Sequence, residues 1–73
     1  MKLILSNAII NLDRIVSIYV EDGTLRLERN DAAYIVKNIP DNALQQVAVA
    51  TAEGKPYIEL DGILNMEENN DNQ

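Results

Sequence analysis

Two arginines, Arg26 and Arg29, are the residues whose type and spacing best suit binding chemistry in this sequence. A guanidinium group holds a carboxylate through two parallel hydrogen bonds, so both side chains could anchor a carboxylate-bearing protein surface. The alternative is that they pair across strands with Glu21 or Glu28, at roughly a few tenths of a kcal/mol per pair. Both interpretations place Arg26 on the outer, polar face of a predicted β-meander.

Two tyrosines and the first strand are further candidates. Tyr19 and Tyr34 could extend an arginine patch, because tyrosine supplies a large contact area at low entropic cost, or they could cap a sheet edge. Residues 2–5, if they form an edge strand, would leave backbone groups free for a partner's strand, but they could equally be paired on both sides. The candidate partner-binding residues are Lys2, Tyr19, Glu21, Asp22, Arg26, Arg29 and Tyr34.

Catalysis is disfavoured by what the sequence lacks. It has no histidine and no cysteine, which removes disulfides, thiolate chemistry, zinc ligation and imidazole acid–base catalysis. The serine and threonine hydroxyls therefore lack the usual base. Glu21 and Asp22 are expected at a hairpin tip, where water keeps both carboxylates ionised. We expect a non-enzymatic protein with no catalytic residues, no metal and no cofactor.

Size, charge and hydropathy narrow the class of protein. The chain has 73 residues, of which 47% are apolar, enough for one small packed domain. Six basic and twelve acidic residues give a net charge of −6, which argues against electrostatic capture of a nucleic-acid backbone. The apolar run at residues 3–5 is too short for a secretory signal, and no stretch has the length of a membrane span. We therefore expect a cytoplasmic protein that binds other proteins, with no membrane partner.

The segments that contain the candidate residues are predicted to be mostly β-strands. Asp22-Gly23 lies between two apolar runs and predicts a tight hairpin, because such a turn needs positive φ angles. The sequence predicts an α+β fold, an antiparallel sheet of about five or six strands with one helix packed on one face. Strands are expected at residues 3–5, 8–11, 15–20, 24–28, 33–36 and 57–60, with a brief further run at residues 63–64.

The single helix is expected at about residues 41–53. Asp41 is its expected N-cap, Gly54 provides a left-handed stop and Pro56 prevents continuation. A helical spacing of three and four residues predicts a buried stripe. The stripe consists of Leu44, Val47, Ala48 and Thr51.

The end of the chain changes character. We expect a single domain over residues 1–65 and a disordered acidic tail at residues 66–73, since no apolar residue follows Met66. Such a segment cannot bury enough surface to offset its ordering entropy. The tail could engage a basic partner surface or simply keep the protein in solution.

Three segments of the predicted sheet resemble two bacterial groups. The segments are residues 10–18 (INLDRIVSI), 25–28 (LRLE) and 33–36 (AYIV). They resemble the LytTR-type DNA-binding domain and the short FlbD-like flagellar proteins. This resemblance implies a small regulator that acts on nucleic acid, although LytTR domains present a basic DNA-binding face that this acidic chain lacks.

In length and composition, the whole chain resembles small transcription regulators encoded by phages, of the type found in a lytic Xanthomonas phage. Such proteins bind host RNA polymerase and displace its sigma factor. The resemblance implies a non-enzymatic inhibitor of bacterial transcription that acts in the host cytoplasm by binding RNA polymerase subunits. Two alternatives stay open: a LytTR- or FlbD-like regulator acting on nucleic acid, and a structural or oligomerisation module.

Overall fold

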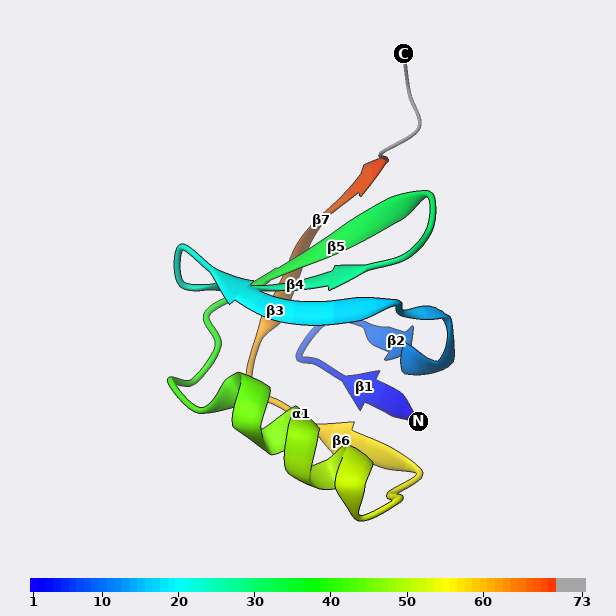
Figure 1. The fold of residues 1–73 in the computed structure, drawn as a ribbon. Coiled ribbons are helices and arrows are strands. Elements are labelled where there is room, and N and C mark those ends of the chain that lie inside the picture. The colour runs from blue at the N-terminus through cyan, green and yellow to red at the C-terminus, as the bar shows by residue number, and fades with distance from the viewer. Residues whose placement is uncertain (70–73) are drawn as a thin grey trace.

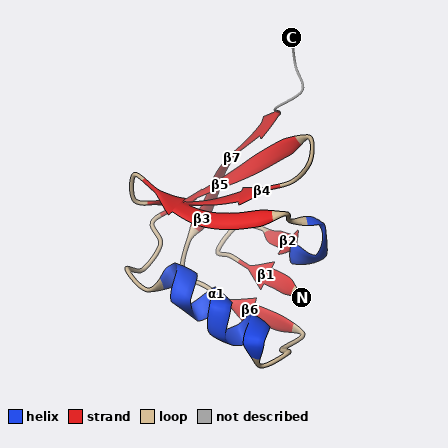
Figure 2. Cartoon of the chain, in the orientation of Figure 1, coloured by secondary structure: helices blue, strands red, loops and turns tan. Residues whose placement is uncertain are grey.

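A computed structural model describes residues 1–69 of the chain (Figures 1 and 2). These residues form seven strands, one α-helix and one short 3₁₀ helix. The predicted α+β class is confirmed, but the strands form two sheets rather than one. In chain order the elements are β1 (Lys2–Ile4), β2 (Ile9–Asn11), η1 (Leu12–Arg14), β3 (Ser17–Glu21), β4 (Thr24–Glu28), β5 (Ala32–Lys37), α1 (Ala43–Ala52), β6 (Tyr57–Glu59) and β7 (Ile63–Asn69).

The larger sheet is antiparallel, with strand order β3-β4-β5-β7. Its first hairpin turns at Asp22 and Gly23, both with positive φ (54° and 76°), as the Asp-Gly pair predicts. Leu25, Leu27 and Val36 share one face of this sheet and are fully buried. The predicted meander is therefore confirmed, and its apolar face supplies much of the core.

The smaller sheet has the order β2-β1-β6 and joins segments from opposite ends of the chain. β1 runs antiparallel to β2 and parallel to β6, where Leu3 lies between Ile10 and Ile58. Of the two alternatives left open for residues 2–5, the paired one is present, because β1 lies between β2 and β6. The strand predicted at residues 57–60 forms as β6, which pairs in parallel with β1.

Helix α1 is shorter than predicted, and the face that it buries is rotated about the helix axis relative to the predicted stripe. Asp41 does not cap it; Asn42 precedes the first turn, and its side chain makes no capping hydrogen bond. The residues that α1 buries are Ala43, Val47 and Ala50, so only Val47 of the predicted stripe is among them. Leu44 is consequently 38% exposed. The expected stop is present, because Gly54 follows the helix with a φ of 68°.

The C-terminal boundary also differs from the prediction. Residues 66–69, expected in a disordered tail, form the second half of β7 and pair with β5. Pairing with β5 gives this polar segment the order that its own composition could not supply. Asn65 is the extra residue of an irregularity that separates the Ile35–Met66 and Val36–Leu64 pairs. The rest of the predicted tail, residues 70–73, lies outside the described residues.

The two sheets share one core and meet at a close junction. Leu3 and Leu5 from the N-terminal segment pack in the same cluster as Leu27 and Val36. At the junction the Ser6 N–H donates to the Gly62 carbonyl at 3.0 Å. In Figure 1 the larger sheet lies above the smaller one, and α1 lies beside β6.

Candidate functional site

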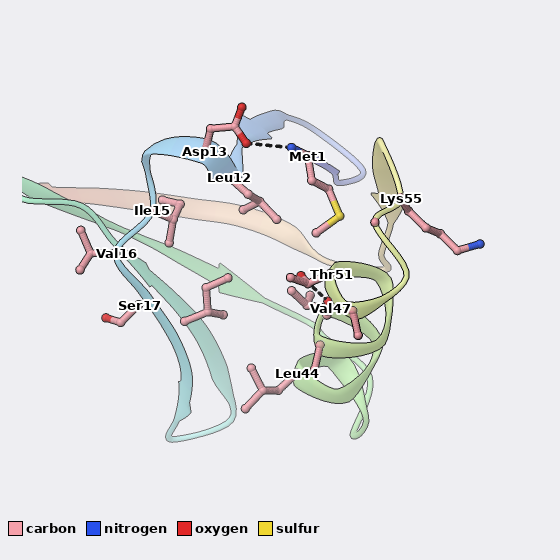
Figure 3. A pocket seen from close by; sticks show the side chains of 14 residues that line it. Met1, Leu12, Asp13, Ile15, Val16, Ser17, Leu44, Val47, Thr51 and Lys55 are labelled. Carbon is pink, nitrogen blue, oxygen red and sulfur yellow. Dashed lines mark hydrogen bonds and ion pairs between the residues drawn. The ribbon is translucent and has the colours of Figure 1, made fainter.

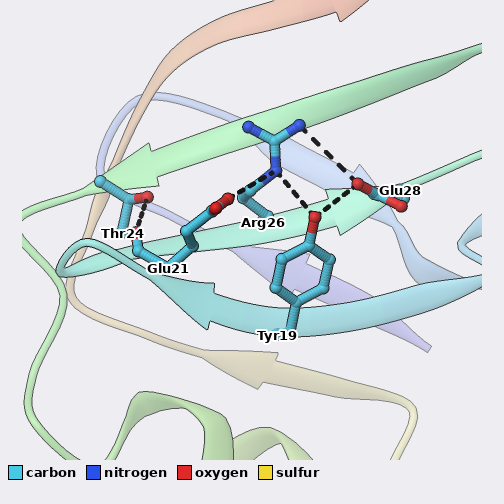
Figure 4. A network of polar contacts seen from close by, with 5 residues as sticks. All are labelled: Tyr19, Glu21, Thr24, Arg26 and Glu28. Atoms are coloured by element: carbon cyan, nitrogen blue, oxygen red, sulfur yellow. Dashed lines mark hydrogen bonds and ion pairs between the residues drawn. The ribbon is translucent and has the colours of Figure 1, made fainter. Parts of the chain in front are cut away.

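The first cluster of predicted site residues is a polar network on the outer face of the larger sheet (Figure 4). Tyr19 and Arg26 are direct cross-strand partners. The Tyr19 hydroxyl donates to Glu28 Oε2 at 2.6 Å, and Arg26 Nε donates to that hydroxyl at 3.1 Å. The Arg26 guanidinium also lies 3.7 Å from carboxylate oxygens of both Glu21 and Glu28. Of the two interpretations of Arg26, the cross-strand pairing is the arrangement present.

This network changes the acid–base behaviour of Tyr19. The Glu28 carboxylate accepts the phenolic hydrogen bond, which raises the pKa of Tyr19 above its ordinary value. The nearby Arg26 guanidinium acts in the opposite direction on this pKa but does not outweigh Glu28. Tyr19 therefore remains a neutral hydrogen-bond donor across the physiological range.

The second cluster gathers around Arg29 and is separate from the first. Arg29 Nη2 donates to Glu67 Oε2 at 2.6 Å, and Nη1 donates to the Tyr34 hydroxyl at 3.3 Å. The guanidinium also lies 5.3 Å from the centre of the Tyr34 ring, within range of a cation–π contact. Asp31 completes the cluster at 3.6 Å from Arg29 Nε.

The register of the sheet places the two tyrosines on opposite faces. Tyr34 is opposite Leu27 and packs against the core, whereas Tyr19 lies on the outer face with Arg26. A joint patch of both arginines and both tyrosines is therefore not formed. Glu67 was missed as a site residue because a disordered tail offers no fixed position; β7 places it opposite Tyr34.

The remaining predicted site residues lie apart from both clusters. Lys2 is on β1, in the smaller sheet, between Asn11 and Tyr57. Asp22 occupies the tip of the β3–β4 hairpin and is exposed. The predicted set is thus distributed over four places, and its two arginines are already engaged with carboxylates of the same chain.

A more open surface lies between α1, η1 and β3, where a groove of about 800 Å³ runs along the helix (Figure 3). Its walls are mostly aliphatic, and we call it the β3 groove. Val16 is 68% exposed there, and Leu44 lines it because the helix is turned away from the predicted stripe. Its apolar lining includes Leu12, Ile15, Val16, Ile18, Leu44 and Val47.

The polar groups of the β3 groove are already engaged or lie at its rim. Asp13 Oδ1 accepts from the Met1 ammonium at 2.9 Å, which holds the pKa of this carboxyl below its usual value. The Thr51 hydroxyl donates to the Val47 carbonyl at 2.8 Å. The Lys55 side chain extends away from the groove (Figure 3). This arrangement suits burial of apolar side chains from a partner.

Other kinds of site find little support in the described part of the chain. Among residues 1–69, no three carboxylate-bearing side chains lie close enough together to hold a metal ion. No helix within that range is long and apolar enough to span a bilayer. No protein-family model, curated protein or solved structure matches this chain.

Proposed function

We propose that this protein is a non-enzymatic inhibitor of bacterial transcription that binds host RNA polymerase and interferes with sigma-factor engagement. The observation that carries the binding role is the β3 groove, which is lined by the exposed side chains of Val16 (68%) and Leu44 (38%). Exposed aliphatic residues around a concave surface are typical of sites where a partner's side chain is buried. The choice of polymerase as partner comes from the resemblance of the whole chain to small phage-encoded transcription regulators.

The charge of the chain supports a protein partner with a basic surface. A net charge of −6 repels nucleic acid but attracts the basic protein surfaces that otherwise hold it. In this proposal, long-range attraction speeds encounter in the host cytoplasm, and the β3 groove provides the apolar contact that makes the complex persist.

The arginines do not favour the nucleic-acid alternative. Arg26 and Arg29 both lie within ion-pair distance of carboxylates, the closest being Arg29 to Glu67 at 2.6 Å. A phosphate backbone would have to displace these carboxylates, and their negative charge would oppose its approach. The regulator that acts directly on nucleic acid therefore stays the weaker proposal.

The test is co-purification with bacterial RNA polymerase, combined with sigma-dependent transcription in vitro. Val16→Asp places a charge in the β3 groove and should weaken polymerase binding by about 10-fold or more. Val20→Asp is the matched control: Val20 is also exposed and on β3, but it does not line the groove. The control should inhibit transcription like the unmodified protein.

Two outcomes would overturn the proposal. The first is that the unmodified protein neither binds polymerase nor alters sigma-dependent transcription. The second is that Val16→Asp and Val20→Asp behave alike, which would exclude the groove as the contact surface. Sedimentation over a range of protein concentrations tests the oligomerisation alternative, because a second copy seated in the β3 groove would raise the mass and Val16→Asp would abolish that increase.

A further inference from the structure

Strand β6 has an open edge on the side away from β1. It is the last strand in the order β2-β1-β6, and within residues 1–69 no other strand pairs with it. A strand in this position presents unpaired backbone donors and acceptors, which make it a template for an additional strand.

Two hydrogen bonds fix the direction of the backbone groups of β6. The Lys2 N–H donates to the Pro56 carbonyl at 3.1 Å, and the Leu60 N–H donates to the Ile4 carbonyl at 3.0 Å. Residues 56 and 60 therefore face β1. Because the N–H and C=O of alternate residues point to opposite sides of a strand, those of Tyr57 and Glu59 point to the open side.

These outward groups have no partner among the described hydrogen bonds. No backbone or side-chain bond to the N–H or C=O of Tyr57 or Glu59 is formed within residues 1–69. Both residues are exposed, with Tyr57 at 53%. Since both residues are open to solvent, a peptide backbone could hydrogen-bond to these groups at little cost.

A second groove, of about 750 Å³, borders this edge, with α1 as its opposite wall. We call it the β6 groove. From the helix it is lined by Gln46, Val49 and Glu53, and Val49 is 47% exposed. A strand edge facing a helix across a groove is an arrangement that recognises extended peptides, with the backbone on the strand and side chains against the helix.

The edge of β7 shows how this protein closes a strand edge elsewhere. The Asn7 side chain acts as a substitute strand there: its Oδ1 accepts from the Leu64 N–H at 2.9 Å, and its Nδ2 donates to the Leu64 carbonyl at 3.1 Å. Further along β7, the Glu67 carboxylate adds a charge of the kind that discourages strand pairing. β6 has no comparable amide cap among the described contacts.

The chemistry of the groove indicates which peptide would fit. Ile58 faces the core, and its neighbours Tyr57 and Glu59 project to the opposite face. Glu53 lies 3.7 Å from Lys55 Nζ, whereas Glu59 has no ion-pair partner among the described residues. A cation on the peptide would thus find a free carboxylate at Glu59.

We infer that β6 accepts an extended segment of a partner protein as an added strand, with a lysine or arginine beside Glu59 and an apolar residue on the side of Ile58 and Val49. The segment recognised is one in which basic and apolar residues alternate, since neighbouring side chains of a strand point to opposite faces. This site lies across α1 from the β3 groove, so it does not depend on the proposed function.

The first experiment uses a short acetylated peptide of alternating lysine and valine as the probe, with amide hydrogen exchange followed by NMR. In the free protein, the amides of Tyr57 and Glu59 should exchange quickly, while that of Ile58, which bonds to β1, is protected. Bound peptide should slow exchange at Tyr57 and Glu59 by about 10-fold or more. Unchanged exchange at both amides, or a dissociation constant weaker than about 1 mM, would overturn the inference.

A second experiment separates strand addition from simple charge attraction. Two versions of the probe are N-methylated, one at every valine and one at every lysine. Only one set of amides can face β6, so one version should lose binding and the other should keep it. If both versions bind as well as the unmodified peptide, the contact is electrostatic adhesion and the added strand is excluded.

A pair of protein variants tests the position of the charge. Glu59→Lys should weaken binding of the probe by roughly 3- to 10-fold at low salt. Asp22→Lys makes the same charge change at the β3–β4 hairpin tip and should have little effect. Equal weakening by both variants would show that only net charge matters. Protection of Tyr57 and Glu59 that rises with protein concentration, without peptide, would instead show that a second copy occupies the edge.

Discussion

The β7 edge and the charged side chains of the larger sheet are engaged differently from the β6 edge of the smaller sheet. The larger sheet pairs its arginines with its own carboxylates, and Asn7 caps its β7 edge at Leu64. The smaller sheet leaves the backbone groups of Tyr57 and Glu59 without a partner in the described chain. Charged residues alone are therefore a poor guide to a binding surface, because charges that neutralise each other have little left to offer a partner.

Both proposed binding surfaces flank α1. This helix is largely composed of small residues and buries only Ala43, Val47 and Ala50. It packs against β3 of the larger sheet and β6 of the smaller one, and a groove remains on each side of it. One groove offers mostly aliphatic side chains and the other offers backbone groups together with a carboxylate, so the two would select different features of a partner.

The largest expected effect tests whether the two sheets are one folding unit. Leu3, in the smaller sheet, and Leu27, in the larger sheet, are both fully buried in one core cluster. Leu3→Ala and Leu27→Ala should each lower the free energy of unfolding by about 2–5 kcal/mol, because each leaves a cavity in the shared core. Urea denaturation, followed by circular dichroism, measures both values.

The control and the contrary outcome come from amide exchange. Val16→Ala, at a position 68% exposed, should change the free energy of unfolding little. If Leu3→Ala accelerated exchange only in β1, β2 and β6, while amides of β4 and β5 kept their protection, the sheets would be independent units. The contrast between them would then be one of stability as well as of polar satisfaction.

A smaller effect is expected at the junction of the sheets. A Cβ at Gly62 would lie 2.9 Å from Val36 Cγ1 and 3.3 Å from Ile39 Cγ2, closer than packed carbon atoms tolerate. Gly62→Ala should therefore cost about 1–3 kcal/mol through overpacking. Asp61→Ala, at the neighbouring exposed residue, is the matched control for thermal or urea unfolding. Equal stability of the two variants would mean that the junction has room to adjust.

The difference between the sheets also sets how much of the fold can be predicted from the sequence. The larger sheet is connected mainly by short turns, and Asp22-Gly23 indicates the first of them through its need for positive φ. The parallel pairing of β1 with β6 brings together residues more than fifty positions apart, and no local pattern specifies it. The single predicted sheet was wrong for this reason, and the same long-range pairing explains why the sequence left the position of residues 2–5 in the sheet open.

The candidate site was less predictable than the fold, because it depends on register and on rotation of the helix. Alternation placed Arg26 on the outer face correctly, but only the pairing of β4 with β5 puts Tyr34 on the core face. The predicted buried stripe of the helix was wrong, because the face that the helix buries is rotated about its axis relative to that stripe. Leu44 was expected in the core and lines a groove instead. Composition suggested disorder at Glu67, where pairing with β5 supplies a fixed position.

A still smaller effect is expected from the Arg29–Glu67 ion pair, although it is the shortest in the larger sheet at 2.6 Å. Both side chains are partly exposed, so solvent screens the pair. Glu67→Gln should lower the free energy of unfolding by less than about 1 kcal/mol, and the loss should shrink as salt is added. Glu53→Gln, which removes the more distant contact to Lys55, should cost less. A salt-independent loss larger than 1.4 kcal/mol, which is about tenfold in the equilibrium constant of unfolding, would show that this ion pair supports the core.

The smallest effect lies in the titration of Tyr19, whose pKa is raised because its hydroxyl donates to the Glu28 carboxylate. A raised pKa in the folded state means that this hydrogen bond stabilises the fold fully below the unfolded pKa of about 10 and is lost as the pH rises through the folded value. Glu28→Gln removes the negative acceptor, so the pKa of Tyr19 should fall toward its ordinary range. Ultraviolet absorbance of the phenolate measures this, with Tyr19→Phe identifying the Tyr19 component. An unchanged Tyr19 titration in Glu28→Gln would show that the outer-face network is too loose in solution to hold its charges together, and the contrast between the paired charges of the larger sheet and the Glu59 carboxylate of the smaller one, unpaired in the described chain, would weaken accordingly.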